Sequence, residues 1–136
     1  FESQQYIVME FVDGMTLKQY INQNAPLAND EANLKLLPEI LSAMDMAHSH
    51  GIIHRDIKPG NIFLYKEHYC LGDFGIAVEN PSSQDFRVGT QDYWAPEQAG
   101  DMFSDKYDHR MDIYSLGLVL YELADTMSVS IITVTE

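Results

Sequence analysis

Cysteine, basic residues and long apolar runs are all scarce in this sequence. The single cysteine, Cys70, excludes an internal disulfide framework and fits a reducing compartment. Eight basic residues stand against 21 acidic ones, which gives a net charge of -13 and leaves no Lys/Arg cluster that could follow a phosphate backbone. We therefore expect no nucleic-acid partner, and we interpret the acidity as a solvated surface.

Membrane and secretion signals are also missing from this stretch of sequence. No segment approaches the roughly 18 apolar residues of a membrane-spanning helix, and Phe1-Glu2-Ser3 begins no signal peptide. We expect a cytoplasmic protein with no membrane segment in this chain, while an anchor outside these residues stays open. With 46% hydrophobic residues, the 136-residue chain can form the core of one domain at most, and it indicates no oligomeric state.

The sequence does contain an unusual polar stretch at residues 54–61, His-Arg-Asp-Ile-Lys-Pro-Gly-Asn. It is too polar for a buried strand, and its acid, base and amide lie too close together for one helix face, so it predicts a loop that presents side chains. Asp56 could accept a proton from a hydroxyl, and Lys58 could neutralise charge on a transferring phosphoryl group. Asn61 and Asp73 could offer Mg2+ the oxygen ligands that it prefers. Together these are the parts of a phosphoryl-transfer site.

Three histidines, His48, His50 and His54, allow a different interpretation as a zinc site. They straddle a helix end and a loop rather than one helix face, and no cysteine lies near them. Asp56 would have to supply a carboxylate ligand. The spacing therefore favours phosphoryl transfer over zinc binding.

Strands are predicted in two places. Residues 6–12 are β-branched and aromatic, and residues 62–64 and 69–71 are two short apolar runs on either side of a polar turn. The second pair predicts a hairpin that joins Asn61 to Asp73. Two strands of this kind can bring a metal ligand from each end to one place.

Three helices are predicted from apolar spacing and cap residues. Residues 16–24 form a short helix, a longer one runs from residue 29 or 30 to Gly51, and residues 112–123 form a buried helix that is apolar on nearly every face. Pro38 lies inside the longer helix, where it should remove a hydrogen bond and cause a kink. Residues 126–136 indicate a strand or an aggregation-prone tail.

In order and spacing, these motifs resemble those of eukaryotic-type (Hanks-type) serine/threonine protein kinases. The family's catalytic loop H-R-D-x-x-x-x-N is matched by His54, Arg55, Asp56 and Asn61, its metal motif by Asp73-Phe74-Gly75, and its A-P-E motif by Ala95-Pro96-Glu97. The resemblance implies an α+β, protein-kinase-like fold, here a mainly helical C-lobe fragment with a small β-hairpin at the catalytic loop and the N-lobe missing. It makes residues 1–125 a partial kinase domain and residues 126–136 a tail that departs from the family.

The resemblance also implies ATP and Mg2+ as cofactors and assigns roles by position. The implied catalytic residues are Asp56, Lys58, Asn61 and Asp73, the last two being the metal ligands. The implied ATP-binding residues are Met9, Glu10, Val12, Thr16 and Phe63, with Phe63 as the floor under the adenine. His54 is expected to pack beneath Phe74, and Asp112 to hold the backbone of the catalytic loop.

The implied partner is a protein with a Ser or Thr acceptor. Lys58 follows the catalytic Asp by two positions, and residues 89–97 match the G-T-x-x-Y-x-A-P-E form of serine/threonine kinases. Thr90 would then bridge Asp56 and Lys58. Phe86 stands at the usual phosphorylation position, so we hypothesise that Asp85 supplies a fixed negative charge to Arg55. The activation and substrate loop thus involves Arg55, Asp85, Thr90, Trp94 and Glu97, of which Glu97 is expected to lack its usual Arg partner.

The implied function is transfer of the ATP γ-phosphate to Ser or Thr hydroxyls by a longer chain. We expect residues 1–136 alone to be inactive, because the family's Gly-rich loop and strand Lys are absent. The alternative is a pseudokinase-like remnant that binds nucleotide or serves as a scaffold without catalysis. Pro96-Glu97-Gln98 resembles both bacterial serine/threonine kinases and the kinases of a translation initiation factor. This leaves the lineage open, with the bacterial one favoured.

Overall fold

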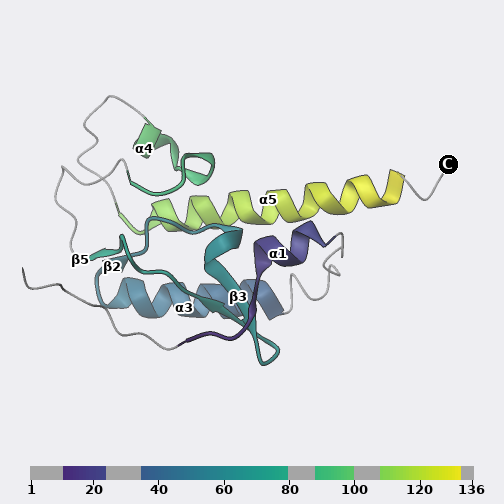
Figure 1. Ribbon diagram of the computed structural model, residues 1–136. Helices are drawn as coiled ribbons and strands as arrows, with labels where there is room; N and C mark the ends of the chain where they lie inside the picture. Colours follow the sequence, from purple (N-terminus) through teal and green to yellow (C-terminus); the bar gives the residue numbers. More distant parts are fainter. Residues whose placement is uncertain (1–10, 24–34, 80–87, 100–107, 133–136) are drawn as a thin grey trace, which may run out of the picture.

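The computed structural model describes residues 11–23, 35–79, 88–99 and 108–132, with only the backbone for residues 78–79 and 125–132. It combines helices with two small antiparallel sheets (Figure 1). The longer elements are α1 (Leu17–Asn22), α3 (Leu37–Ser49), β3 (Ile62–Tyr65), β4 (His68–Leu71) and α5 (Arg110–Ile132). The shorter ones are β1 (Met15–Thr16), β2 (Ile52–Ile53), η2 (Pro59–Asn61), β5 (Val78–Glu79), η3 (Gln91–Tyr93) and α4 (Pro96–Ala99).

The predicted hairpin is confirmed as β3 and β4. Ile62 pairs with Leu71 and Tyr65 with His68, so the connection is the two-residue turn Lys66-Glu67. Both turn residues have positive φ, 48° and 66°, which matches the twist of the flanking strands. Strand β1 adds to the other edge of β3, and a second sheet pairs β2 with β5.

The strand predicted at residues 6–12 is not found where the structure describes it. Residues 11 and 12 have no regular structure, and residues 6–10 lie outside the described part of the chain. The strand that pairs with the hairpin is β1, which comes just after this segment. Its second residue, Thr16, also caps α1, since its hydroxyl accepts the backbone N–H of Gln19 at 3.1 Å and Gln19 Oε1 accepts the N–H of Thr16 at 2.8 Å.

Helix α3 has a change of helical winding next to Pro38. Its α-helical part begins at Leu37, directly after a wider helical turn at residues 35–36, so Pro38 lies in the first α-helical turn. The kink there stays a prediction. The predicted start at residue 29 or 30 lies outside the described residues. The end is as predicted, because Gly51 follows the helix with a φ of 73°.

Helix α5 differs from its prediction in two ways. It continues to Ile132, so residues 126–132 are helical rather than a strand. It is also buried on one side only, because Ile113 and Tyr121 are 49% and 71% exposed. Among the described helices, none combines the length and apolar character needed to cross a membrane.

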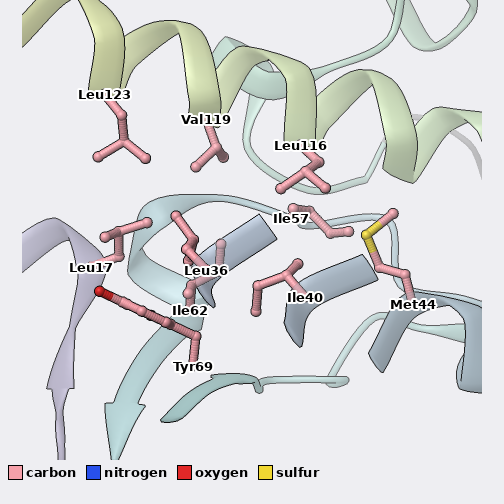
Figure 2. Packing of buried hydrophobic residues seen from close by; sticks show 10 residues of the cluster. All are labelled: Leu17, Leu36, Ile40, Met44, Ile57, Ile62, Tyr69, Leu116, Val119 and Leu123. Atoms are coloured by element: carbon pink, nitrogen blue, oxygen red, sulfur yellow. The ribbon is translucent and has the colours of Figure 1, made fainter. Parts of the chain in front are cut away.

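The hydrophobic core lies between α5 and α3 (Figure 2). Leu116, Val119 and Leu123 point from α5 toward side chains of α1, α3 and the hairpin, and each is at most 4% exposed. Ile57 of the polar stretch 54–61 is fully buried in the same core. Burying an isoleucine contributes about 1.5–3 kcal/mol, so this side chain anchors the loop that presents Asp56 and Lys58.

Candidate active site

Asp112, in the first turn of α5, holds the backbone of the loop at residues 54–61. Its carboxylate is 1% exposed and accepts the backbone N–H groups of His54 and Arg55, both at 2.9 Å. His48 of α3 adds a third hydrogen bond from Nε2 at 2.8 Å. The predicted supporting role of Asp112 is therefore confirmed, and α3, the loop and α5 meet at one buried carboxylate.

His54 packs against Phe74 as predicted. The two rings meet edge to face with their centroids 4.6 Å apart. Its Nε2 donates to the carbonyl of Gly72 at 3.0 Å, while Nδ1 accepts the N–H of Asp56 at 3.3 Å, an arrangement that fits the neutral ring. His54 thus links the loop to the Asp-Phe-Gly turn.

The three histidines do not converge on a metal site. His48 faces Asp112, and His50 Nδ1 lies 2.8 Å from the carbonyl of Met46. Over the part of the chain that the structure describes, no group of three His, Cys, Asp or Glu side chains could hold a metal ion. His48 serves as a second support of the loop through Asp112 instead.

Asp56 is at the centre of a hydrogen-bonded cluster. Lys58 Nζ lies 2.8 Å from Oδ2, and Asn61 Nδ2 donates to Oδ2 at 3.0 Å. Oδ1 accepts both the N–H and the hydroxyl of Thr90 at 2.8 Å. Burial alone would raise the pKa of Asp56, but the contacts of Lys58 and Thr90 outweigh it and hold the pKa below its usual value. The carboxylate is therefore ionised and fixed in direction.

Thr90 bridges Asp56 and Lys58, which confirms the predicted contact. Lys58 Nζ donates to Thr90 Oγ1 at 2.7 Å, in addition to its ion pair with Asp56. The Lys58 side chain is 28% exposed, so solvent can reach its ammonium group. The cluster thus presents one negative and one positive group side by side.

Asn61 and Asp73 lie at the two ends of the hairpin, as the sequence predicts. The carbonyl of Asn61 accepts the N–H of Gly72 at 2.9 Å, which closes the base of β3 and β4 directly before Asp73. Asn61 Nδ2 is engaged by Asp56, so Oδ1 is the atom left for a cation. Asp73 is exposed and has a φ of 57°. One amide oxygen and one carboxylate are hard donors that suit Mg2+.

The residues implied in ATP binding are only partly within the described chain. Met9 and Glu10 lie outside it, and Val12 lies in irregular backbone. Thr16 pairs directly with Phe63 across β1 and β3. The ring of Phe63 covers Gly72, where an added Cβ would meet it at 2.8 Å. The structure therefore places Thr16 and Phe63 side by side on one sheet. Phe63 also lies against Gly72, the residue directly before Asp73.

The segment at residues 88–95, which we call the Thr90 loop, lies on the catalytic loop. Gly89 has a φ of 94°, and a Cβ there would meet the carbonyl oxygen of Arg55 at 2.4 Å, so only glycine fits. At the other end of the loop, Ser115 Oγ donates to the carbonyl of Tyr93 at 2.7 Å, and the Tyr93 hydroxyl donates to Glu122 at 2.5 Å. Helix α5 therefore supports both the catalytic loop and the Thr90 loop.

The remaining loop residues have mixed outcomes. Arg55 donates from Nε to the carbonyl of Ile76 at 2.6 Å. Asp85 lies outside the described residues, so the predicted pairing of Arg55 with Asp85 stays a hypothesis.

Trp94 Nε1 is buried and has no hydrogen-bond partner among the described residues. The pKa of Arg110 is raised mainly by its hydrogen bond to Asp108 and by the charge of Asp108, with a smaller contribution from the charge of Glu97. The expectation about the usual Arg partner of Glu97 stays a prediction.

Sequence reasoning missed the supports of the site. The sequence pattern places His48 on a helix and among the zinc candidates only, and Ser115 and Glu122 lie within a helix interpreted as buried and apolar on nearly every face. These three residues are polar but lie within helices whose spacing is otherwise apolar, and this was the signal in the sequence that could have indicated a supporting role. A buried polar side chain needs a partner, but the pattern alone does not say which one.

The comparisons with known proteins agree with this geometry. The family model of the protein kinase domain matches residues 2–131. The probable serine/threonine-protein kinase PknB of Lactococcus lactis is 57% identical over 90% of this chain, and PknB of Mycolicibacterium smegmatis is 42% identical over 87%. The interferon-induced, double-stranded RNA-activated protein kinase of Mus musculus is 44% identical over 89%.

These matches cover 20%, 19% and 24% of the relatives, so the chain spans about a fifth of their length. They include bacterial and animal proteins, which keeps both lineages open. With the family model matching nearly the whole sequence, the chain belongs to the protein kinase family, among its Hanks-type serine/threonine members.

Proposed function

We propose that the protein carrying this chain is a serine/threonine protein kinase that transfers the γ-phosphate of ATP to Ser or Thr hydroxyls of other proteins. The observation that carries the proposal is the cluster around Asp56, in which Lys58, Asn61 and Thr90 all contact one ionised carboxylate. A chain without catalysis would have no chemical need for this arrangement. Asp56 and Asn61 also stand at the Asp and Asn positions of the family's H-R-D-x-x-x-x-N motif.

Each residue of the cluster has a separate task in this proposal. Asp56 accepts a hydrogen bond from the acceptor hydroxyl, orients it and takes its proton as the hydroxyl oxygen bonds to the γ-phosphorus of ATP, while the bond from that phosphorus to the bridging oxygen breaks and ADP leaves. Lys58 places its ammonium beside the same carboxylate, where it neutralises charge on the phosphoryl group in transit. Fixing Asp56 through Thr90 and Asn61 supplies positioning, from which most of the acceleration of phosphoryl transfer comes.

Asn61 and Asp73 would hold Mg2+, which supplies charge neutralisation across the phosphates when it is bound. The chain's own part is to keep Asn61 Oδ1 and the Asp73 carboxylate at adjoining ends of the hairpin. Thr16 and Phe63 would lie toward the ribose and the adenine, together with Met9, Glu10 and Val12. We also propose that residues 1–125 are the hinge-to-α5 part of a kinase domain in a cytoplasmic protein, and that they need an N-lobe to be active.

The decisive experiment uses Asp56→Asn in the full-length protein. We expect phosphoryl transfer to a Ser or Thr peptide to be abolished, while the affinity for ATP stays within about twofold, because Asp56 faces the acceptor rather than the nucleotide. Asp45→Asn, an exposed carboxylate on α3, is the matched control and should retain transfer. Equal loss of transfer and of ATP binding would contradict the assigned roles. ATP binding by the wild type without transfer would support the scaffold alternative.

A further inference from the structure

Gln98 is a buried polar residue that the proposed mechanism does not use. It lies in α4, directly after the A-P-E motif, and is 2% exposed. Its Oε1 accepts the backbone N–H of Ala95 at 2.9 Å, and its Nε2 donates to the carbonyl of Val88 at 3.4 Å. One side chain therefore joins the two ends of the Thr90 loop.

The two contacts make different chemical demands. The Ala95 contact is half of a capping box, in which the third residue of a helix reaches back to the N–H before the helix. Any side chain with a suitably placed oxygen could make it, including Glu. The Val88 contact needs a donor, which a Gln amide has and an ionised Glu lacks. The Val88 contact therefore distinguishes Gln from an ionised Glu at this position, whereas the cap does not.

Val88 is connected to the catalytic cluster through only two residues. Gly89 lies on the carbonyl of Arg55, and Thr90 donates its N–H and its hydroxyl to Asp56 Oδ1, both at 2.8 Å. Moving the Val88 carbonyl would rotate the peptide units that carry these contacts. The backbone of Gly89 lies close to the catalytic loop, because an added Cβ there would meet the carbonyl oxygen of Arg55 at 2.4 Å.

We propose that Gln98 is a positioning residue, which holds the Val88 carbonyl and thereby keeps Thr90 on Asp56 and Lys58. The kinetic part of this inference rests on the proposed kinase function. The geometric part does not, because the contact of the Thr90 amide with Asp56 exists with or without catalysis.

Two substitutions in the full-length protein separate positioning from capping. Gln98→Met removes both contacts at nearly constant volume, and Gln98→Glu keeps the acceptor for Ala95 and removes the donor to Val88. We expect both to lower kcat for a Ser or Thr peptide by about three- to tenfold, the effect of one lost hydrogen bond, with the KM for ATP within about twofold. A wild-type kcat in Gln98→Glu would show that Gln98 only caps α4 and would overturn the proposal.

Coupling to Thr90 tests the route of the effect. In a Thr90→Val background, Gln98→Glu should lower kcat by a smaller factor than in the wild type, because the hydroxyl contacts are gone and only the contact of the Thr90 amide with Asp56 is left to position. The control is Gln19→Met, which removes the same kind of capping contact from α1. The fold-changes in kcat caused by Gln19→Met and by Thr90→Val should multiply in the double variant, because the two sites act independently. If the fold-changes of Gln98→Glu and Thr90→Val also multiply, the effect of Gln98 does not run through the Thr90 hydroxyl, which contradicts the proposed positioning of Thr90 on both Asp56 and Lys58.

Hydrogen exchange at the Thr90 amide supplies a readout that needs no activity. Gln98→Glu should speed exchange of this amide by about three- to tenfold, and Gln19→Met should leave its rate unchanged. Unchanged exchange in Gln98→Glu would overturn the positioning role even in an active kinase. If the full-length wild type showed no kinase activity, faster exchange of the Thr90 amide in Gln98→Glu would still support the positioning role, and only the kinase function would be rejected.

Discussion

The carboxylate of Asp112 accepts the backbone N–H of Arg55 at 2.9 Å, across 57 positions of sequence. Arg55 has a φ of 68°, a conformation that costs a residue with a side chain roughly 1–3 kcal/mol unless its surroundings fix it. The buried carboxylate supplies that fixation and also binds the N–H of His54. The first turn of α5 therefore determines where the backbone of Asp56 lies.

Asp112→Asn should destabilise the protein by about 3 kcal/mol. The amide keeps one oxygen, but its NH2 group would face backbone N–H groups, which leaves a buried donor unsatisfied and removes a charge-assisted bond. The free energy of unfolding in urea measures the effect. Asp45→Asn, which is exposed on α3, should change it by no more than about 0.5 kcal/mol. A loss below about 1 kcal/mol for Asp112→Asn would mean that the loop does not depend on this carboxylate.

Tyr93→Phe should cost more stability than removal of the neighbouring ion pair. The Tyr93 hydroxyl donates to Glu122 Oε2 at 2.5 Å, and Lys18 Nζ contacts Oε1 at 2.8 Å. Burial and the negative charge of Glu122 raise the pKa of Tyr93 far above its usual value, so it remains a donor at every ordinary pH.

We expect Tyr93→Phe to lose about 1.5–3 kcal/mol, as for a hydrogen bond to a charged group. Lys18→Met should lose less than about 1 kcal/mol, because the Lys18 side chain is 47% exposed and solvent screens the pair. Thermal or urea unfolding of the two variants side by side gives the comparison. Equal losses would show that the Tyr93 bond is weaker than its geometry indicates.

Glu39 makes stability depend on pH. Burial would raise its pKa, but the N–H of Tyr69 and the ring of His68 outweigh burial and lower it. A carboxyl whose pKa is lower in the folded state stabilises that state above its unfolded pKa, and the contribution is lost as pH falls through the folded value. We expect the free energy of unfolding to fall between about pH 5 and about pH 3.

Glu39→Gln isolates this contribution, because it keeps an acceptor for Tyr69 and removes the charge. The variant should be less stable than the wild type near neutral pH, and the difference should shrink toward pH 3. Urea unfolding midpoints of both proteins across this range provide the measurement. A difference that stays constant with pH would show that the effect is packing and not ionisation.

Local chemistry accounts for what the sequence predicted well. The hairpin follows from two short apolar runs with a polar turn between them. The contact of Thr90 with Asp56 and Lys58 follows from the family resemblance, whereas the catalytic roles of these residues stay a proposal. Long-range supports were harder to predict. Asp112 could be placed only through the family resemblance, and His48, Ser115 and Glu122 act on loops that are distant in sequence.

The incorrect predictions have equally local causes. Residues 126–132 carry β-branched side chains, yet they continue α5, since an established helix extends more easily than a new one starts. Exposure of Ile113 and Tyr121 could not be predicted either, because a helix that is apolar all round does not indicate which side is covered.

Gly89→Ala tests the contact between the Thr90 loop and the catalytic loop. The residue has a φ of 94°, and the new Cβ would meet the carbonyl oxygen of Arg55 at 2.4 Å and Asp56 Oδ1 at 3.3 Å. Backbone cannot yield as a flexible side chain can, so we expect a loss of about 2 kcal/mol or more and a kcat lowered by more than about tenfold.

Gly117→Ala is the matched control, because it makes the same change inside α5. A Cβ at Gly117 meets nothing within 4 Å, so the substitution should raise stability by about 0.5–1 kcal/mol through helix propensity alone. Urea unfolding should therefore show a lower free energy of unfolding for Gly89→Ala and a higher one for Gly117→Ala than for the wild type. If Gly89→Ala kept both its stability and its kcat, the Thr90 loop would have to lie farther from Arg55, and Thr90 could not then hold the carboxylate of Asp56.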